Sequence, residues 1–216
     1  MIRWRRHLKS CLIVILLSLV MSGCAGIDGG QGVLLQEGFD DPGSGWGIER
    51  QPEFERGYSG GAYFIQLYVP NWFVWTTPDR SFGDVIVEVD VQPTSDSPSG
   101  HFGLLCRHTD WDNFYYFAIS ADGYYGIFRR VGGGSLELVT GDGRGMSFSP
   151  AIKTGGEVNS VMAVCRGDQL TFYANGELLE SVIDDALRRG DVGLGAGSDE
   201  AGAVRVQFDN LLVTRP

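Results

Sequence analysis

One short stretch spaces its acidic side chains as sugar-cleaving chemistry would require. Glu88 and Asp90 lie two residues apart in the segment 84–92, where valines alternate with a second face that is polar except for Ile86. In a strand, residues two apart point to the same face of the sheet, so the two carboxylates share a face. Retaining glycoside hydrolysis needs two carboxyl groups about 5–5.5 Å apart. Gln92 takes the next position on this face and cannot exchange a proton. We therefore interpret the face as solvated, with Glu88 and Asp90 as weak catalytic candidates that could still bind a sugar.

Large aromatic side chains suggest binding rather than catalysis. Tryptophan and tyrosine combine a flat apolar face with a polar group, which suits them to stack on sugar rings. Trp111 lies between two aspartates in the expected turn 109–112, where a ring has little reason to be buried. It is the leading candidate for contact with a ligand, followed by Trp72, Trp75 and Tyr116. For aromatics within strands the alternative is the core, because alternation sends half of them inward.

The first 23 residues have the features of an export signal. Four basic residues between positions 3 and 9 precede an apolar run at 11–21, which is short for a membrane span but suits a signal peptide. The string Met21-Ser22-Gly23-Cys24 resembles a bacterial lipobox, although leucine is more usual at its first position. The resemblance implies cleavage before Cys24 and acyl chains, palmitate among them, on Cys24. The alternatives are an ordinary secretory signal that is cleaved nearby and an uncleaved anchor.

The rest of the chain divides into a short tether and one domain. Residues 24–32 are rich in glycine and lack a core-forming pattern, so we expect a flexible tether after the lipidated cysteine. Residues 33–216 suit a single domain. The whole chain has a formal net charge of −10, and loss of the signal would make it more acidic. This charge argues against nucleic acid and against adhesion to anionic lipid, and is compatible with a neutral glycan or calcium.

Two cysteines remain once those at positions 11 and 24 are assigned to the signal and the lipid. Cys106 and Cys165 both fall in expected strands. An even pair in an exported domain is consistent with a disulfide. Two buried free thiols that behave as small hydrophobic groups are the alternative.

The hydrophobic pattern predicts an all-β domain. Asn175-Gly176 separates two alternating segments, and this dipeptide is the strongest short hairpin signal because a type I′ turn needs positive φ at both central residues. About a dozen short strands with glycine, aspartate and asparagine turns predict an antiparallel two-sheet jelly-roll sandwich. We expect residues 48–57 and 141–156 to be irregular, and no window of the mature chain has a clear helical stripe.

Several short strings resemble the concanavalin A-like and laminin G-like jelly rolls. The nearest likeness is to bacterial domains of the 3-keto-disaccharide hydrolase type, which are also described as family 16 glycoside hydrolase-like. The strings that carry it are Phe39-Asp40-Asp41-Pro42, Gly45-Trp46, Asn71-Trp72-Phe73-Val74-Trp75, Gly103-Leu104-Leu105-Cys106-Arg107, Asp112-Asn113-Phe114-Tyr115-Tyr116-Phe117, Cys165-Arg166-Gly167-Asp168, Gly190-Asp191-Val192-Gly193-Leu194 and Phe208-Asp209-Asn210. The resemblance implies the fold, and it implies a structural Ca²⁺ between the chain ends with Asp40 and Asp209 among its ligands. It is a weak guide to activity.

Together these features predict a lipid-anchored protein of the cell envelope. We expect it to face outward from the plasma membrane or an outer membrane and to carry a non-catalytic binding domain whose ligand is a carbohydrate. One alternative is a glycoside-cleaving enzyme of the same fold. The other is a structural protein that contacts other envelope proteins.

Overall fold

The computed structural model describes residues 32–95, 100–200 and 202–216. The predicted signal, Cys24 and nearly all of the tether lie outside the described residues. All regular structure in the described part is β-strand. None of the described residues belongs to a helix that is long and apolar enough to cross a membrane.

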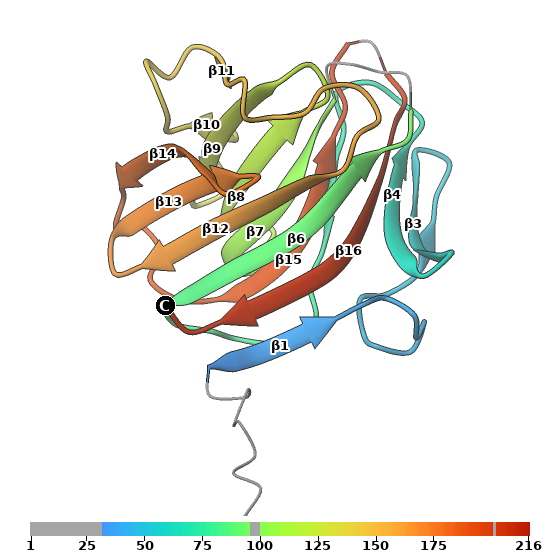
Figure 1. The fold of residues 1–216 in the computed structure, drawn as a ribbon, viewed down its shortest axis with the longest axis horizontal. Helices are drawn as coiled ribbons and strands as arrows, with labels where there is room; N and C mark the ends of the chain where they lie inside the picture. The colour runs from blue at the N-terminus through green and yellow to red at the C-terminus, as the bar shows by residue number, and fades with distance from the viewer. Residues whose placement is uncertain (1–31, 96–99, 201) are drawn as a thin grey trace, which may run out of the picture. The chain divides into compact units, whose positions relative to one another are not determined.

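The strands form two antiparallel sheets that pack as a jelly-roll sandwich (Figure 1). In spatial order the larger sheet contains β14 (Glu177–Ile183), β13 (Gln169–Ala174), β12 (Asn159–Arg166), β6 (Val85–Pro93), β16 (Val204–Thr214), β4 (Ala62–Leu67), β3 (Phe54–Ser59) and β2 (Glu49–Arg50), with β1 (Val33–Glu37) paired to β16. The smaller sheet contains β10 (Glu137–Leu138), β9 (Tyr124–Arg130), β8 (Asn113–Ser120), β7 (His101–Asp110), β15 (Asp191–Gly197) and β5 (Phe73–Thr76), with β11 (Ser147–Phe148) paired to β9. The predicted fold class is therefore confirmed.

The core lies between the two sheets and follows the alternation of the sequence. On β6, Val85, Val87, Val89 and Val91 are buried, while Ile86, Glu88 and Asp90 between them point to the other face. Full burial of such a side chain contributes about 1.5–3 kcal/mol. A disulfide joins Cys106 on β7 to Cys165 on β12 and so links the sheets covalently. This confirms the predicted pairing.

The hairpin between β13 and β14 forms as predicted. Asn175 has φ of 52° and Gly176 has φ of 82°, which are the positive values that a type I′ turn requires. The side chain of Asn175 is also used, since its amide donates to the carbonyl of Ala151 at 2.8 Å. The turn therefore fixes both the register of the hairpin and the neighbouring connection.

The expectation that residues 48–57 are irregular is wrong. Most of this segment forms β2 and β3, and β3 pairs with β4 from Phe54 opposite Leu67 to Ser59 opposite Ala62. The polar composition that suggested a loop belongs to an edge hairpin, in which charged residues pair across the two strands. Gly60 and Gly61, with φ of 65° and 78°, turn the chain from β3 into β4. This hairpin supplies half of the site described next.

Candidate functional site

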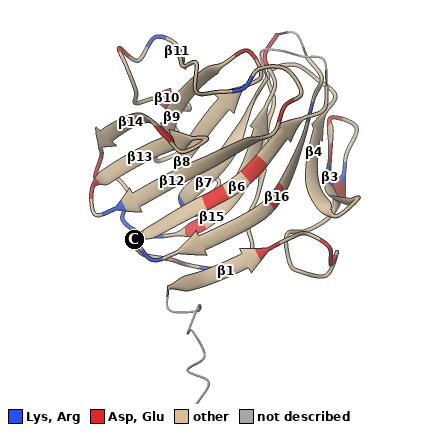
Figure 2. Cartoon of the chain, in the orientation of Figure 1, with Lys and Arg blue, Asp and Glu red and all other residues tan. Residues whose placement is uncertain are grey.

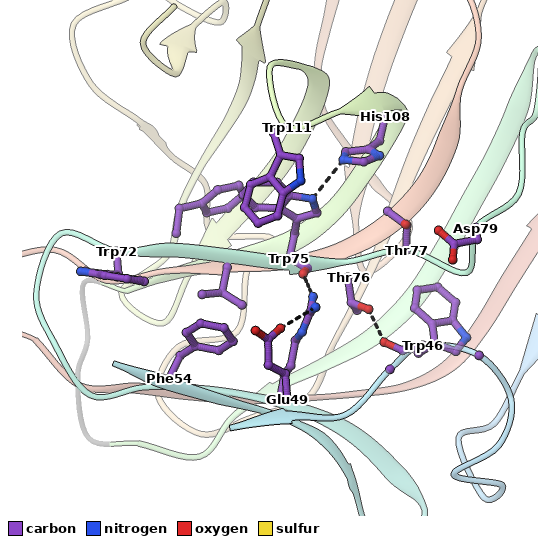
Figure 3. A pocket seen from close by; sticks show the side chains of 15 residues that line it. Trp46, Glu49, Phe54, Trp72, Trp75, Thr76, Thr77, Asp79, His108 and Trp111 are labelled. Carbon is purple, nitrogen blue, oxygen red and sulfur yellow. Dashed lines mark hydrogen bonds and ion pairs between the residues drawn. The ribbon is translucent and has the colours of Figure 1, made fainter. Parts of the chain in front are cut away.

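A groove opens between the β2–β3 hairpin of the larger sheet and β5 at the edge of the smaller sheet (Figure 3). Its volume of about 440 Å³ is within the range of small-molecule sites. The four tryptophans of the described residues border it, at positions 46, 72, 75 and 111, and the ring of Trp46 is buried in the core behind it. The fifth tryptophan of the chain, Trp4, lies in the predicted signal. Tryptophan is thus concentrated in one concave place.

An ion pair forms the polar centre of the groove. Glu49 on β2 lies opposite Arg56 on β3, and Glu49 Oε2 is 2.8 Å from Arg56 Nη2. Arg56 Nη1 also donates to the backbone carbonyl of Trp75, so the guanidinium connects the hairpin to β5. The two side chains remain 23% and 37% exposed, for Arg56 and Glu49 respectively. Solvent and ligand can therefore reach an acceptor and a donor that are held side by side.

Aromatic rings flank this polar centre on two sides (Figure 3). Phe54 and Trp72 lie with their ring centroids 6.3 Å apart. Trp75 and Trp111 meet edge to face at 4.8 Å. Trp111 is 75% exposed and Trp72 is 41% exposed. These rings have apolar surface that no described residue covers, which is costly in water unless a ligand uses it.

His108 on β7 positions the central tryptophan. Trp75 Nε1 donates to His108 Nε2 at 3.0 Å, so this nitrogen must be unprotonated for the bond to form. Burial lowers the pKa of His108 from its usual value, while the carboxylates of Asp110 and Asp79 act in the opposite direction. His108 also stacks on Phe114, with ring centroids 6.0 Å apart and planes 28° from parallel. The Trp75 ring is therefore held from both its edge and its backbone.

Glycines on β15 make room for the aromatic layer beneath the groove. A Cβ at Gly195 would lie 2.8 Å from Leu105 Cδ1, and a Cβ at Gly197 would lie 2.1 Å from His101 Cε1. The alternating glycines of this strand thus face the outer rings, while the residues between them face the core. Larger side chains here would displace the layer on which the groove rests.

The structure places the predicted ligand-binding residues unequally. Trp111, Trp72 and Trp75 line the groove. Tyr116 is fully buried in the layer below, where its hydroxyl lies 3.1 Å from His101 Nδ1 and burial raises its pKa well above the usual value. Tyr116 supports the site from beneath and does not line it.

The two weak catalytic candidates lie on the outer face of β6, away from the groove. Glu88 Oε1 accepts a hydrogen bond from Ser160 Oγ at 2.9 Å. Asp90 Oδ2 accepts one from Asn210 Nδ2 at 3.0 Å. Neither residue lines the groove, and each is engaged by a neighbouring strand of its own sheet.

The aspartates predicted as calcium ligands do not come together in a carboxylate cluster. Asp209 lies on β16, where its Oδ1 accepts from the backbone N–H of Asn210 at 2.7 Å. Asp40 lies in the connection after β1, beside Gly61. Among the described residues there is no group of three or more histidine, cysteine, aspartate or glutamate side chains that could hold a metal ion. The donor set therefore gives no support to a calcium site there, and the assignment stays a prediction.

Sequence reasoning missed three residues that are central to the groove: Glu49, Phe54 and Arg56. Their polar neighbours predict an irregular segment there. The usable signal was the alternation of Phe54, Arg56 and Tyr58 directly before Gly60-Gly61, which together describe a strand and a turn.

Comparisons with known proteins identify the fold. The chain is similar to a carbohydrate binding module, CBM66, from Bacillus subtilis, with 19% identity and a TM-score of 0.54 over 78% of this chain and 91% of that one. It is also similar to a Bacillus subtilis protein of unknown function with a galectin-like fold, with 11% identity and a TM-score of 0.63 over 86% and 96%. A Bacillus licheniformis beta-glucanase matches with 11% identity and a TM-score of 0.56 over 87% and 99%.

The domain is a concanavalin A-like jelly roll. At these identities the likeness shows the fold alone. No family model matches the sequence, and none of the curated proteins matches it.

Proposed function

We propose that this protein is a non-catalytic carbohydrate-binding domain whose ligand site is the tryptophan-lined groove. The observation that carries the proposal is the convergence of Trp72, Trp75 and Trp111 around one Glu–Arg pair. Most protein surfaces do not concentrate these residues in a concave site. Aromatic rings with a few well-placed polar groups are the usual composition of a site for an amphipathic ligand.

The chemistry of the groove suits a sugar ring. A pyranose or furanose has apolar C–H faces that can lie on the rings of Trp72 or Trp111. Its neighbouring hydroxyls are both donors and acceptors, so one can donate to Glu49 while the next accepts from Arg56. The ion pair neutralises itself, and Asp79 adds a negative charge nearby. We therefore expect neutral glycans to be preferred over acidic ones.

Two of the compared structures have names that point in the same direction. One is called a carbohydrate binding module and another a beta-glucanase, and both share the fold of this chain. Because one fold hosts many functions, these names support the proposal only together with the groove.

Binding without cleavage is favoured by the carboxylates that are present. A glycosidase needs two carboxyl groups across the scissile bond. Among the described residues, the groove is lined by two carboxylates, Glu49 and Asp79. Glu49 is paired with Arg56 at 2.8 Å. Asp79 is therefore the one carboxylate among the described lining residues that makes no ion pair, and cleavage needs two.

The proposal also includes attachment to a membrane through lipid on Cys24, with the domain facing outward in the cell envelope. It is supported by the order of basic residues, apolar run and cysteine in the first 24 residues. Expression with a labelled fatty acid tests it. The wild-type chain should incorporate label and Cys24→Ala should not; equal labelling of the two would contradict it.

A glycan array tests the ligand class. The mature chain is applied to neutral and acidic oligosaccharides, with calcium and again with EDTA. We expect saturable binding to neutral glycans, reduced in Arg56→Gln, and no release of sugar from the bound glycan. Sugar release that Asp79→Asn abolishes would instead favour the enzyme. Absence of binding by the folded chain would favour a protein-contact role.

A further inference from the structure

The tryptophan-lined groove has a neighbour, a second hollow that begins where β5 ends. Three residues line both: Thr77, Asp79 and His108. Figure 3 shows these three side chains at one end of the groove, with Trp72 at the other. The groove is lined by residues 72–77 and 79 of this segment, and the second hollow by 77 and 79–81. The two therefore follow one another along β5 and the connection after it.

The wall of the second hollow is fixed by contacts with the start of β15. The chain turns sharply at Asp79, whose φ of 56° is in the left-handed region that aspartate adopts more readily than most residues. Phe82 and Gly190 then exchange two backbone hydrogen bonds of 2.8 and 3.0 Å. Asp191 Oδ2 accepts from the backbone N–H of Arg80, also at 2.8 Å. A wall that is ordered before the ligand arrives costs little entropy on binding.

The second hollow is polar and has no excess of either charge. Its lining contains two guanidinium groups, of Arg80 and Arg189, and two carboxylates, of Asp79 and Asp191. Hydroxyl groups of Ser81 and Thr109 lie among them, and none of the described lining residues has a carbocyclic aromatic ring. Figure 2 shows acidic and basic segments interspersed around the C-terminal end of β16, the end of the sandwich on which this hollow lies. We call it the polar hollow.

The arginines of the polar hollow have donors to spare. Arg80 and Arg189 are both exposed, and neither makes an ion pair with a described residue. Asp79 is also exposed without an ion pair among the described residues, whereas Asp191 is buried against two backbone N–H groups. A ligand in the polar hollow can thus reach two guanidinium groups and one carboxylate.

The groove and the polar hollow together are longer than one sugar ring. β5 advances by about 10 Å from Phe73 to Thr76, at about 3.3 Å per residue, and the polar hollow begins beyond Thr76. A sugar ring built from bonds of about 1.5 Å measures roughly 5 Å between its linking oxygens. One ring can therefore occupy the groove or the polar hollow, whereas a chain of about three units can occupy both.

We propose that the ligand is an oligosaccharide chain that lies along β5, with one unit stacked in the tryptophan groove and further units in the polar hollow. The inference rests on the carbohydrate binding proposed above and adds the length of the ligand. At the junction, Asp79 accepts from hydroxyls of the unit that passes Thr77. In the polar hollow, Arg80 and Arg189 donate to hydroxyl and ring oxygens.

The polar hollow then determines specificity. Tryptophan rings stack on apolar C–H faces that many sugars share, so they distinguish one sugar from another weakly. Hydrogen bonds to hydroxyls discriminate more strongly, because an analogue that lacks the hydroxyl leaves its partner unpaired. The groove supplies apolar contact, and the polar hollow selects the sugar type and linkage of the chain.

Oligosaccharides of increasing length test the proposal. Neutral oligomers of glucose, xylose, mannose and fructose, from the single sugar upward, are titrated against the mature chain. The variant R80Q/R189Q replaces both guanidinium groups of the polar hollow by amides and keeps the backbone bond from position 80 to Asp191. R166Q/R215Q is the matched control, because it removes the same charge from exposed arginines that line neither the groove nor the polar hollow.

For a sugar series that binds, we expect affinity to rise at least about tenfold from the single sugar to the longest oligomers, as one added hydrogen bond to a charged group would give. R80Q/R189Q should lose most of this gain, and R166Q/R215Q should keep it. Affinity that is independent of length, or a gain that R80Q/R189Q retains, would overturn the proposal and leave glycan binding in the groove intact. Failure of every length to bind would contradict the proposed function and this inference with it.

Discussion

The indole N–H of Trp75 donates to Nε2 of His108 at 3.0 Å, so an aromatic surface of the groove depends on the lone pair of a histidine. His108 can accept this bond only while Nε2 carries no proton. Burial lowers the pKa of His108, so the bond is intact at neutral pH and is lost as the pH falls through that lowered pKa.

Glycan affinity should therefore decrease on acidification. The folded protein holds His108 neutral, whereas in the unfolded chain His108 titrates near 6.5, so its contribution to stability also declines as the pH falls below that value. Isothermal titration at about pH 7.5 and at about pH 4.5, on either side of the ordinary histidine pKa, checks the affinity. In His108→Gln, whose amide oxygen can accept the same bond, the part of the pH dependence that comes from His108 should disappear. An unchanged pH profile in this variant would refute the role of His108.

Trp111→Ala should weaken glycan binding without destabilising the fold. Because the Trp111 ring is 75% exposed, its removal leaves no cavity in the core. The loss of one stacked ring should lower affinity by about 1 kcal/mol, or roughly fivefold. Phe148→Ala is the control, because Phe148 is also exposed, at 60%, but does not line the groove. Equal affinity losses in the two variants would argue against a specific role of Trp111.

Arg56→Gln should weaken binding more strongly than Trp111→Ala. It removes a donor to the ligand, the partner of Glu49 and the link to the Trp75 carbonyl. We expect a loss of at least about tenfold, since hydrogen bonds to charged groups contribute about 1.5–3 kcal/mol. Arg50→Gln is the matched control, because Arg50 lies on the neighbouring strand and pairs with Glu55 outside the groove. Surface pairs of this kind contribute little, so this variant should bind like the wild type.

Removal of the disulfide should lower stability and spare binding. The bond joins Cys106 and Cys165, which are 59 residues apart, inside the core between the sheets. Closing a loop of this length stabilises a fold by about 4 kcal/mol in the chain-entropy description. In urea unfolding, the free energy of unfolding of Cys106→Ala/Cys165→Ala should be lower by about this amount. The folded fraction should keep its glycan affinity. Lost affinity in the folded variant would mean that the disulfide also shapes the groove.

Local patterns were sufficient to predict the fold. The alternating valines of β6 and the Asn175-Gly176 turn act over a few residues, so the sequence alone identifies them. The groove could be predicted only in part. Trp72, Trp75 and Trp111 were identified by residue type, but Glu49 and Arg56 become meaningful only when the hairpin meets β5 of the other sheet. That meeting is a long-range contact, which no local pattern encodes.

For a similar reason, the sequence does not predict which aromatic residues are buried beneath the groove and which line it. Tyr116 looks like Trp75 as a candidate, because each is an aromatic residue in a strand. Their different roles depend on which strand lies at the sheet edge: β5 is an edge strand, whereas β8 lies between β7 and β9. Position in the sheet, and not residue type, decides which ring can reach a ligand.

Intrinsic tryptophan fluorescence during titration with a neutral oligosaccharide tests the central claim most directly. Trp72, Trp75 and Trp111 present their rings to the groove, whereas Trp46 is buried in the core, so a change in emission on titration reports mainly these three. We predict a saturable change in emission for the wild type and for Arg50→Gln, and a much weaker response for Arg56→Gln. Glycan binding that leaves the emission unchanged, or that Arg56→Gln does not affect, would contradict the assignment of the groove as the ligand site.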